Sequence, residues 1–224
     1  MGSQRTFASV ADGAYCVAHL GKRASVVATV PENPMKTRLL CLTLAAPALM
    51  AAQQPAPLPP NPLTAMFRTR MVNYQRQLAQ AFDSIPESKF GYKPTPAQQT
   101  IGYVAQHLAA DNYFYCNSFG PLKGTPAAAD TTTADTVKAK WPRDSLLAKL
   151  RTSFKFCEDA LAQLDDAKLA EPIEVRQGNN VVNITRAQRV VGHIIDLVDH
   201  YSQIAIYMRL NGMLPPTALP RPRP

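Results

Sequence analysis

The chain has 224 residues, of which 46% are hydrophobic, and its formal net charge at pH 7 is +8. A mild basic excess without a stripe of basic residues and interleaved aromatic ones does not indicate a nucleic-acid partner. The length suffices for one domain with a buried core behind an N-terminal segment of different composition.

The segment that begins at Met35 has the pattern of a secretory signal peptide. Lys36 and Arg38 precede an apolar run over residues 39–50, and small residues follow at 51–52. The run is too short to span a bilayer, and a Pro-rich linker follows it over residues 53–61. We therefore predict a signal peptide at residues 35–52, export to the periplasm or the extracellular space, and no stable membrane span after processing.

Residues 1–34 precede this predicted signal peptide. Because a signal peptide acts from the N-terminus of a chain, we interpret residues 1–34 as a mis-assigned extension and Met35 as the true start. A genuine N-terminal tail is the alternative, and N-terminal sequencing of the native protein separates the two.

After residue 61 the chain shows four long helical patterns and almost no strand pattern. The spacing of apolar residues predicts helices over about 62–84, 100–119, 144–164 and 185–211. Thr185 and Gln188 form a capping-box pattern at the start of the last helix, and Gly212 ends it. These lengths predict an all-α fold, a four-helix bundle over residues 62–214, followed by a Pro/Arg-rich tail over 215–224.

The connections between these helices differ in character. Residues 120–137 are predicted to be a loop rich in Pro, Ala, Thr and Asp. The connection before the last helix carries a turn at Gly178 and Asn179 between two short β-prone pieces. Thr95, Pro96 and Gln98 could add a capped turn before the second helix.

Two helices carry the residues that could bind a metal ion. Asp196 and His200 lie four residues apart, so that both side chains can reach one ion, and His107 is expected to face inward from the second helix. Two histidines and one carboxylate leave coordination positions open for water or substrate. His193 could pair with Asp196, but it lies about 10 Å from His200 along the helix axis. Ordinary buried histidines with hydrogen-bond partners are the alternative interpretation.

Two stretches of sequence resemble the DinB-like family of metalloenzymes. They are "PESKFGYKPTPAQQTIGYVAQHLAADNYFYC" and "DHYSQIAIYMRLNGMLPP", and the resemblance covers about residues 61–216. It implies a four-helix bundle of the DinB/YfiT-like type and a divalent metal ion held by His107, Asp196 and His200. Many members have histidine where this chain has Asp196, and a carboxylate shifts the preference among zinc, nickel, iron and manganese toward harder ions.

The resemblance also gives expectations about function. Its relatives include bacillithiol transferases and a mycothiol-dependent maleylpyruvate isomerase, so it implies a small-molecule substrate, which could be a thiol. Asp111, Asp199 and His193 are candidates for orienting the metal ligands. The leading hypothesis is a metal-dependent transferase or hydrolase. A non-catalytic structural or ligand-binding bundle and a mononuclear iron oxygenase are the alternatives.

Two cysteines and the oligomeric state remain open at the level of sequence. Cys116 and Cys157 are the only cysteines after residue 52, and an even pair in an exported protein favours a disulfide. Two buried free thiols are an equal alternative. A homodimer is compatible with the pattern.

Overall fold

The structure, a computed structural model, describes residues 19–20, 24–25 and 58–220. The chain divides into two units, residues 1–57 and 58–224. In the first unit, β1 (His19–Leu20) pairs antiparallel with β2 (Ala24–Ser25). The predicted signal peptide at 35–52, residues 53–57 of the predicted linker and all but residues 19–20 and 24–25 of the predicted N-terminal extension lie outside the described residues, and they stay predictions.

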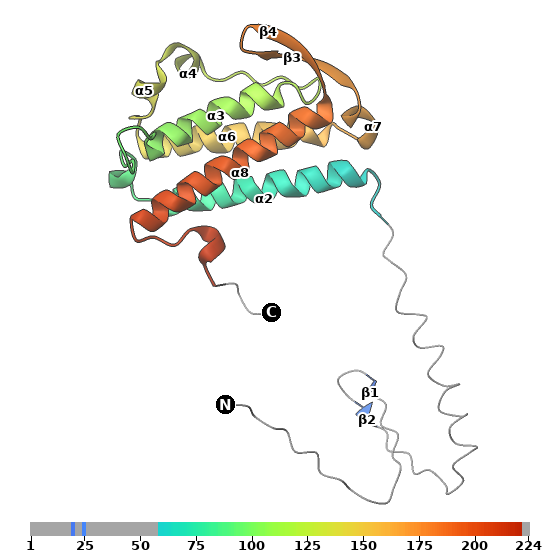
Figure 1. The fold of residues 1–224 in the computed structure, drawn as a ribbon, viewed down its shortest axis with the longest axis horizontal. Helices are drawn as coiled ribbons and strands as arrows, with labels where there is room; N and C mark the ends of the chain where they lie inside the picture. Colours follow the sequence, from blue (N-terminus) through green and yellow to red (C-terminus); the bar gives the residue numbers. More distant parts are fainter. Residues whose placement is uncertain (1–18, 21–23, 26–57, 221–224) are drawn as a thin grey trace, which may run out of the picture. The chain divides into compact units, whose positions relative to one another are not determined.

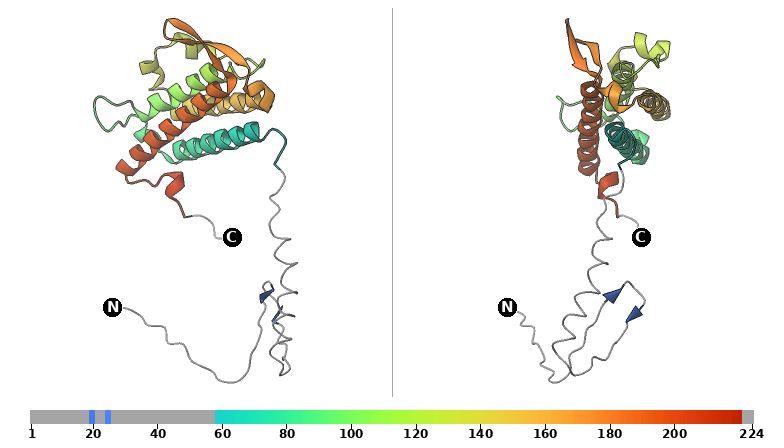
Figure 2. Two further views of the ribbon diagram at one scale, coloured as in Figure 1. Left: turned by 45° about the vertical axis from the view of Figure 1, so that its right-hand side comes forward. Right: turned by 90° about the vertical axis from the view of Figure 1, so that its right-hand side faces the viewer.

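The second unit is a bundle of four long helices, which confirms the predicted fold class (Figure 1). These helices are α2 (Pro62–Ser84), α3 (Ile101–Cys116), α6 (Arg143–Ala162) and α8 (Arg186–Leu210). α3 packs against α6 and α8, and α2 packs against the same two helices, so each helix has two long neighbours (Figure 2).

Shorter elements connect the long helices. They are η2 (Glu87–Lys89), α4 (Ala128–Thr132), α5 (Asp135–Lys138), α7 (Asp166–Leu169), β3 (Pro172–Gln177), β4 (Asn180–Thr185) and η3 (Pro216–Ala218). The prediction of a plain loop over 120–137 is therefore wrong. Asp130 holds the two short helices in place, because its backbone oxygen accepts a hydrogen bond from Lys138 and its carboxylate pairs with Lys149 of α6.

The predicted turn before the last helix is confirmed. β3 and β4 form an antiparallel hairpin in which Ile173 lies opposite Ile184 and Gln177 lies opposite Asn180. Gly178 takes a φ of 58° at the turn, a left-handed conformation that glycine adopts without steric cost. The hairpin leads directly into α8, so it fixes the start of the helix that carries Asp196 and His200.

Both helices of the candidate site begin at a threonine cap. The Thr185 hydroxyl accepts from the Gln188 backbone, and the Gln188 side chain accepts from the Thr185 backbone, which confirms the capping box. α3 begins after Thr100, whose hydroxyl accepts from Tyr103 N. The turn at Thr95 and Gln98 is a separate turn that does not start this helix.

The core forms between the apolar faces of the four helices, with one departure from the pattern. Leu63 and Met66 continue the apolar spacing of α2 but are 52% and 47% exposed, whereas Thr64 is buried. The Asp166 carboxylate accepts hydrogen bonds from the Leu63 and Thr64 backbones and from the Thr64 hydroxyl. These bonds turn Thr64 inward at the first turn, and Leu63 therefore points to solvent.

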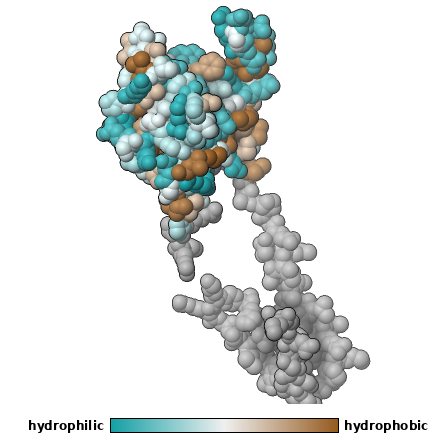
Figure 3. Space-filling view, turned by 60° about the vertical axis from the view of Figure 1, so that its left-hand side comes forward, coloured by the Kyte–Doolittle hydropathy of each residue, from teal (hydrophilic) through white to brown (hydrophobic). Residues whose placement is uncertain are grey.

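The surface of the second unit is mixed in polarity. On the face drawn in Figure 3, hydrophobic side chains gather in small groups among hydrophilic ones. Among the described helices, none is both long and apolar enough to cross a bilayer.

Candidate metal centre

Four side chains that can bind metal meet where α3 packs against α8. His107 and Asp111 lie four residues apart on α3, and Asp196 and His200 lie four residues apart on α8. Residues four apart lie on the same helix face, so each helix contributes one histidine and one carboxylate to the contact.

The distances bring these groups into one cluster. His107 Nε2 lies 3.1 Å from Asp111 Oδ2, and His200 Nε2 lies 3.5 Å from Asp196 Oδ1. One ligand atom each from His107, Asp111 and His200 lies within 4.8 Å of the other two. The rings of His107 and His200 are 5.1 Å apart between centroids, edge to face. The structure therefore brings two of the three residues expected to bind metal, His107 and His200, together with Asp111, whereas Asp196 lies outside this group and contacts His200.

A chain of hydrogen bonds orients the His200 ring. Its Nδ1 contacts Gln203 Oε1 at 3.3 Å, while Gln203 Nε2 donates to the Tyr207 hydroxyl at 3.0 Å. That hydroxyl donates to the backbone oxygen of Gln99. Because the amide oxygen of Gln203 can only accept, His200 Nδ1 carries the proton, and in the neutral ring Nε2 keeps its lone pair.

This orientation places a lone pair opposite a carboxylate. His200 Nε2 faces Asp196 Oδ1, and two electron-rich atoms at this distance need a proton or a cation between them. Burial opposes charge on His200, but the hydrogen bond and charge of Asp196 hold the pKa of the imidazole above its ordinary value. The other carboxylate oxygen, Asp196 Oδ2, is enclosed and has no hydrogen-bond partner. A buried carboxylate oxygen without a donor from the protein is a position that suits a cation.

The surroundings of the cluster also shift the pKa of the Asp111 carboxyl. Burial raises the pKa of the Asp111 carboxyl, His107 lowers it, and the nearby Asp196 charge raises it again. Two carboxylates in one partly buried cluster repel each other unless a cation lies near both. The donor types, two imidazole nitrogens and two carboxylates, fit a divalent ion. The donor atoms are 3.1 Å apart in the pair on α3 and 3.5 Å apart in the pair on α8, and His107, Asp111 and His200 lie within 4.8 Å of one another. Metal–ligand bonds of about 2.0–2.2 Å place adjacent ligand atoms about 3–3.5 Å apart.

The cluster is partly open to solvent. The His107 side chain is 37% exposed, whereas the side chains of Asp196 and His200 are mostly buried. A small molecule would approach from the His107 side, while α8 supplies the enclosed wall.

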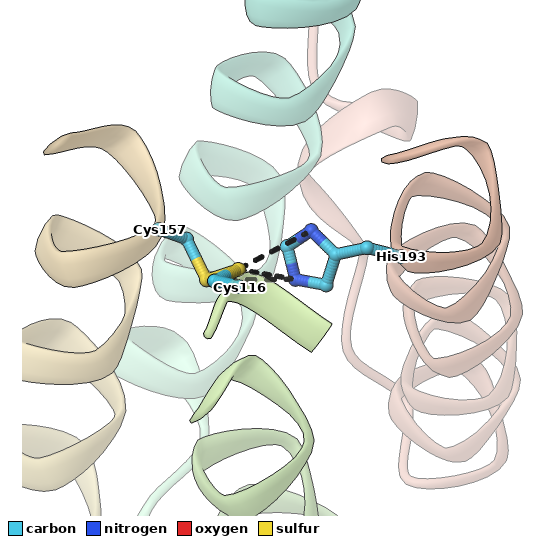
Figure 4. Close-up of side chains that lie close together, drawn as sticks. All are labelled: Cys116, Cys157 and His193. Carbon is cyan, nitrogen blue, oxygen red and sulfur yellow. Dashed lines mark hydrogen bonds between the residues drawn. A yellow bond between two sulfur atoms is a disulfide. The ribbon is translucent and has the colours of Figure 1, made fainter. Parts of the chain in front are cut away.

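His193 lies in a different environment from His200, although both belong to α8. It is fully buried, and its Nε2 contacts Asn112 Oδ1 at 2.8 Å. Figure 4 shows the ring pointing from α8 toward the sulfurs of Cys116 on α3 and Cys157 on α6. These sulfurs are bonded to each other, so of the two alternatives for the cysteine pair the structure contains the disulfide. A disulfide offers no thiolate, and the trio with His193 is not a metal site in this state.

Asp199 and His193 are the remaining candidates for orienting the ligands, and each lies in a different environment. Asp199 is exposed and contributes to no group of metal-binding side chains among the described residues. His193 orients Asn112 and the disulfide region. Gln203 orients the His200 ring, a role that was expected of a carboxylate. The signal in the sequence is that Gln203 comes three residues after His200, on the same helix face.

The comparisons with known proteins agree with this arrangement. The family model of the DinB superfamily matches residues 71–204, which include all four side chains of the cluster. A DinB-like protein from Bacillus cereus is 16% identical, with 67% of this chain and 93% of that chain covered and a TM-score of 0.53. No functionally curated protein matches the chain.

Two further solved structures share the fold. YfiT from Bacillus subtilis, described as a probable metal-dependent hydrolase with an unusual four-helix bundle topology, is 14% identical, with 72% and 94% covered and a TM-score of 0.51. The mycothiol-dependent maleylpyruvate isomerase is 13% identical, with 63% of this chain and 60% of that chain covered and a TM-score of 0.50.

Proposed function

Because the chain belongs to the DinB superfamily, we propose that it is a metal-dependent transferase or hydrolase that acts on a small molecule. The proposed metal ligands are His107, Asp196 and His200, with Asp111 as a fourth. The observation that carries the proposal is the enclosed Asp196 Oδ2, which has no hydrogen-bond partner and belongs to the carboxylate that faces His200 Nε2. Relatives described as a probable metal-dependent hydrolase and as a thiol-dependent isomerase support the class of reaction.

Each residue at this centre has its own proposed role. A divalent ion bound there would lower the pKa of a water or thiol toward neutrality. His107, Asp196 and His200, with Asp111 as a fourth, would hold the ion from α3 and α8. Gln203 keeps His200 in the tautomer that presents Nε2, and the carboxylate of Asp111 lies beside the exposed His107.

Export is part of the same proposal. The disulfide between Cys116 and Cys157 supports it, because such bonds persist in oxidising compartments outside the cytosol. A homodimer is supported by exposed apolar side chains on α8, among them Ile195, Ile206 and Leu210. Light scattering of the purified protein tests the dimer.

A variant panel tests the site. Asp196→Asn, His107→Gln and His200→Gln each remove one donor with little change in volume, and each is expected to weaken Co²⁺ or Mn²⁺ binding at least tenfold in a calorimetric titration. Asp199→Asn is the matched control, because it removes an exposed charge from the same helix, and it is expected to bind like the wild type.

The panel also separates the alternatives. Wild-type binding that survives all three substitutions would contradict the proposed site and favour the non-catalytic bundle. Asp111→Asn decides whether Asp111 is a ligand, since a supporting role costs less affinity than the loss of Asp196. Bound iron that reacts with oxygen would indicate the oxygenase instead.

A further inference from the structure

Arg189 is an enclosed cation without an acidic partner. It lies on α8 and is only 8% exposed, yet no carboxylate of the described residues comes within ion-pair distance of its guanidinium. Buried charges are normally paired, because removing an ion from water is costly. Burial accordingly lowers the pKa of Arg189, and the nearby Tyr115 and Asp111 raise it again.

The groups around Arg189 hold it in place without neutralising it. Its Nη2 donates to the backbone oxygen of Phe114, and the guanidinium lies 4.2 Å and 4.3 Å from the ring centroids of Phe114 and Tyr115. Nε is enclosed without a partner. Nη1 is neither enclosed nor hydrogen-bonded to a described residue. Stacking fixes the plane of the guanidinium, and because Nε is enclosed and Nη2 is bonded to Phe114, Nη1 is the nitrogen left free to bind a carboxylate.

Arg189 lies on the same face of α8 as the metal cluster. Gly192 and Asp196 follow it at three and seven residues, so Arg189 is about 10 Å from Asp196 along the helix axis. The Tyr115 ring lies against Gly192, between Arg189 and Asp196, since a Cβ built on Gly192 would lie 3.3 Å from Tyr115 Cε1. The charges of Asp196 and Arg189 both act on Tyr115. A row therefore runs along the contact between α3 and α8, from the free cation past an aromatic ring to the cluster.

We propose that Arg189 binds the carboxylate of an elongated substrate whose other end reaches the metal, an inference that rests on the proposed function. The substrate class is a small organic acid long enough to extend from Arg189 to the cluster, two helical turns further along α8. The Tyr115 ring contacts the apolar middle of such a molecule. Arg189 acts in recognition and orientation, since it lies two helical turns from the cluster.

Matched acids test this assignment. The Co²⁺-loaded protein is titrated with the dicarboxylates glutarate, pimelate and azelate and with the monocarboxylates pentanoate, heptanoate and nonanoate. Calorimetry gives the affinities, and the visible Co²⁺ bands report whether the metal is reached. In the wild type we expect the second carboxylate to strengthen binding about tenfold or more for at least one chain length.

Variants assign the effect to the residue. Arg189→Met is expected to remove the dicarboxylate preference, while metal binding and the affinity of monocarboxylates that perturb the Co²⁺ bands stay unchanged. Arg189→Lys is expected to restore part of the preference. Arg209→Gln, which removes an exposed charge from the end of the same helix, is the control and keeps it. Thermal unfolding checks that each variant is folded.

The outcomes are distinct. If the wild type binds dicarboxylates and monocarboxylates with equal affinity at every chain length, the assignment is overturned. A preference for dicarboxylates that survives Arg189→Met overturns it as well. In both cases Co²⁺ binding would leave the proposed metal centre standing. Failure to bind Co²⁺ overturns the metal centre and the assignment together.

Discussion

The two histidines of α8 show that the partners of a side chain, more than its position on a helix, decide what it does. His193 is enclosed by the disulfide, Asn112 and aromatic rings, whereas His200 faces two carboxylates and a second histidine. Burial lowers the pKa of His193 to about 4, but the pKa of His200 is raised by Asp196 against the effect of burial. One histidine is therefore a neutral core residue, and the other is suited to bind a cation.

Gln203 offers the first prediction at the scale of a residue. Gln203→Leu removes the acceptor that fixes the His200 ring, and the metal affinity is expected to fall about 10- to 100-fold. Gln203→Glu keeps an acceptor and is expected to bind within a few-fold of the wild type or more tightly. Competition with a chromophoric chelator measures both. Ser202→Ala, at the exposed neighbouring position, is the control, and unchanged binding in Gln203→Leu would contradict the assigned tautomer.

His193 gives a prediction about acid stability. The unfolded imidazole takes up a proton below its ordinary pKa of 6.5, but the folded one stays neutral down to about 4. The free energy of unfolding of the metal-free protein should therefore fall as the pH falls from 6.5 to 4, with a loss of up to about 3 kcal/mol from this group. Urea unfolding at several pH values measures the slope, and His193→Gln should flatten it. Equal slopes for the two proteins would show that His193 does not resist protonation.

At this scale, contacts that depend on spacing along one helix could be predicted from the sequence, whereas contacts that depend on how the helices pack could not. The four-residue spacing of Asp196 and His200 predicts a shared helix face, and they lie on one. The contact of His193 with the disulfide depends on the rotation of α8 against α3 and α6, which no local pattern encodes. The position of Asp111 beside His107 follows from spacing, but its inclusion among the candidate ligands depends on how closely α3 approaches α8.

At the scale of elements, the long helices were predictable because their apolar spacing and their end signals agree. Residues 62–84 were predicted as helix and form α2, and the capping box at Thr185 opens α8 as expected. The second predicted helix runs three residues too far, since the chain leaves the helix at Asn117. α4 and α5 were missed because helices of four or five residues carry too few residues to show a period. Tertiary bonds from Lys138 and Lys149 hold them.

The disulfide provides the prediction for this scale. Cys116 and Cys157 are separated by 41 residues and join α3 to α6. Closing a loop of that length is expected to stabilise the fold by about 2–4 kcal/mol through the unfolded state. Urea unfolding of the wild type with and without reductant should show this loss. The double variant Cys116→Ala/Cys157→Ala should be insensitive to reductant, and a wild type equally insensitive would contradict the bond.

At the scale of the whole molecule, the bundle places a polar contact inside an otherwise apolar arrangement. α2 and α6 supply mainly packing, while α3 and α8 carry the metal-binding side chains. Among the residues that the structure describes beside the candidate site, Arg189 is an enclosed cation without an acidic partner. The fold thus concentrates its chemistry on one helix–helix contact.

The proposed activity depends on a metal ion at that contact, and the most direct measurement is the elemental analysis of protein purified from its native source without chelator or added metal. We predict one divalent ion per chain, lost together with some thermal stability when a chelator is added, because an ion that binds only the folded state stabilises it. A native protein without stoichiometric metal, whose unfolding temperature does not respond to a chelator, would contradict the account.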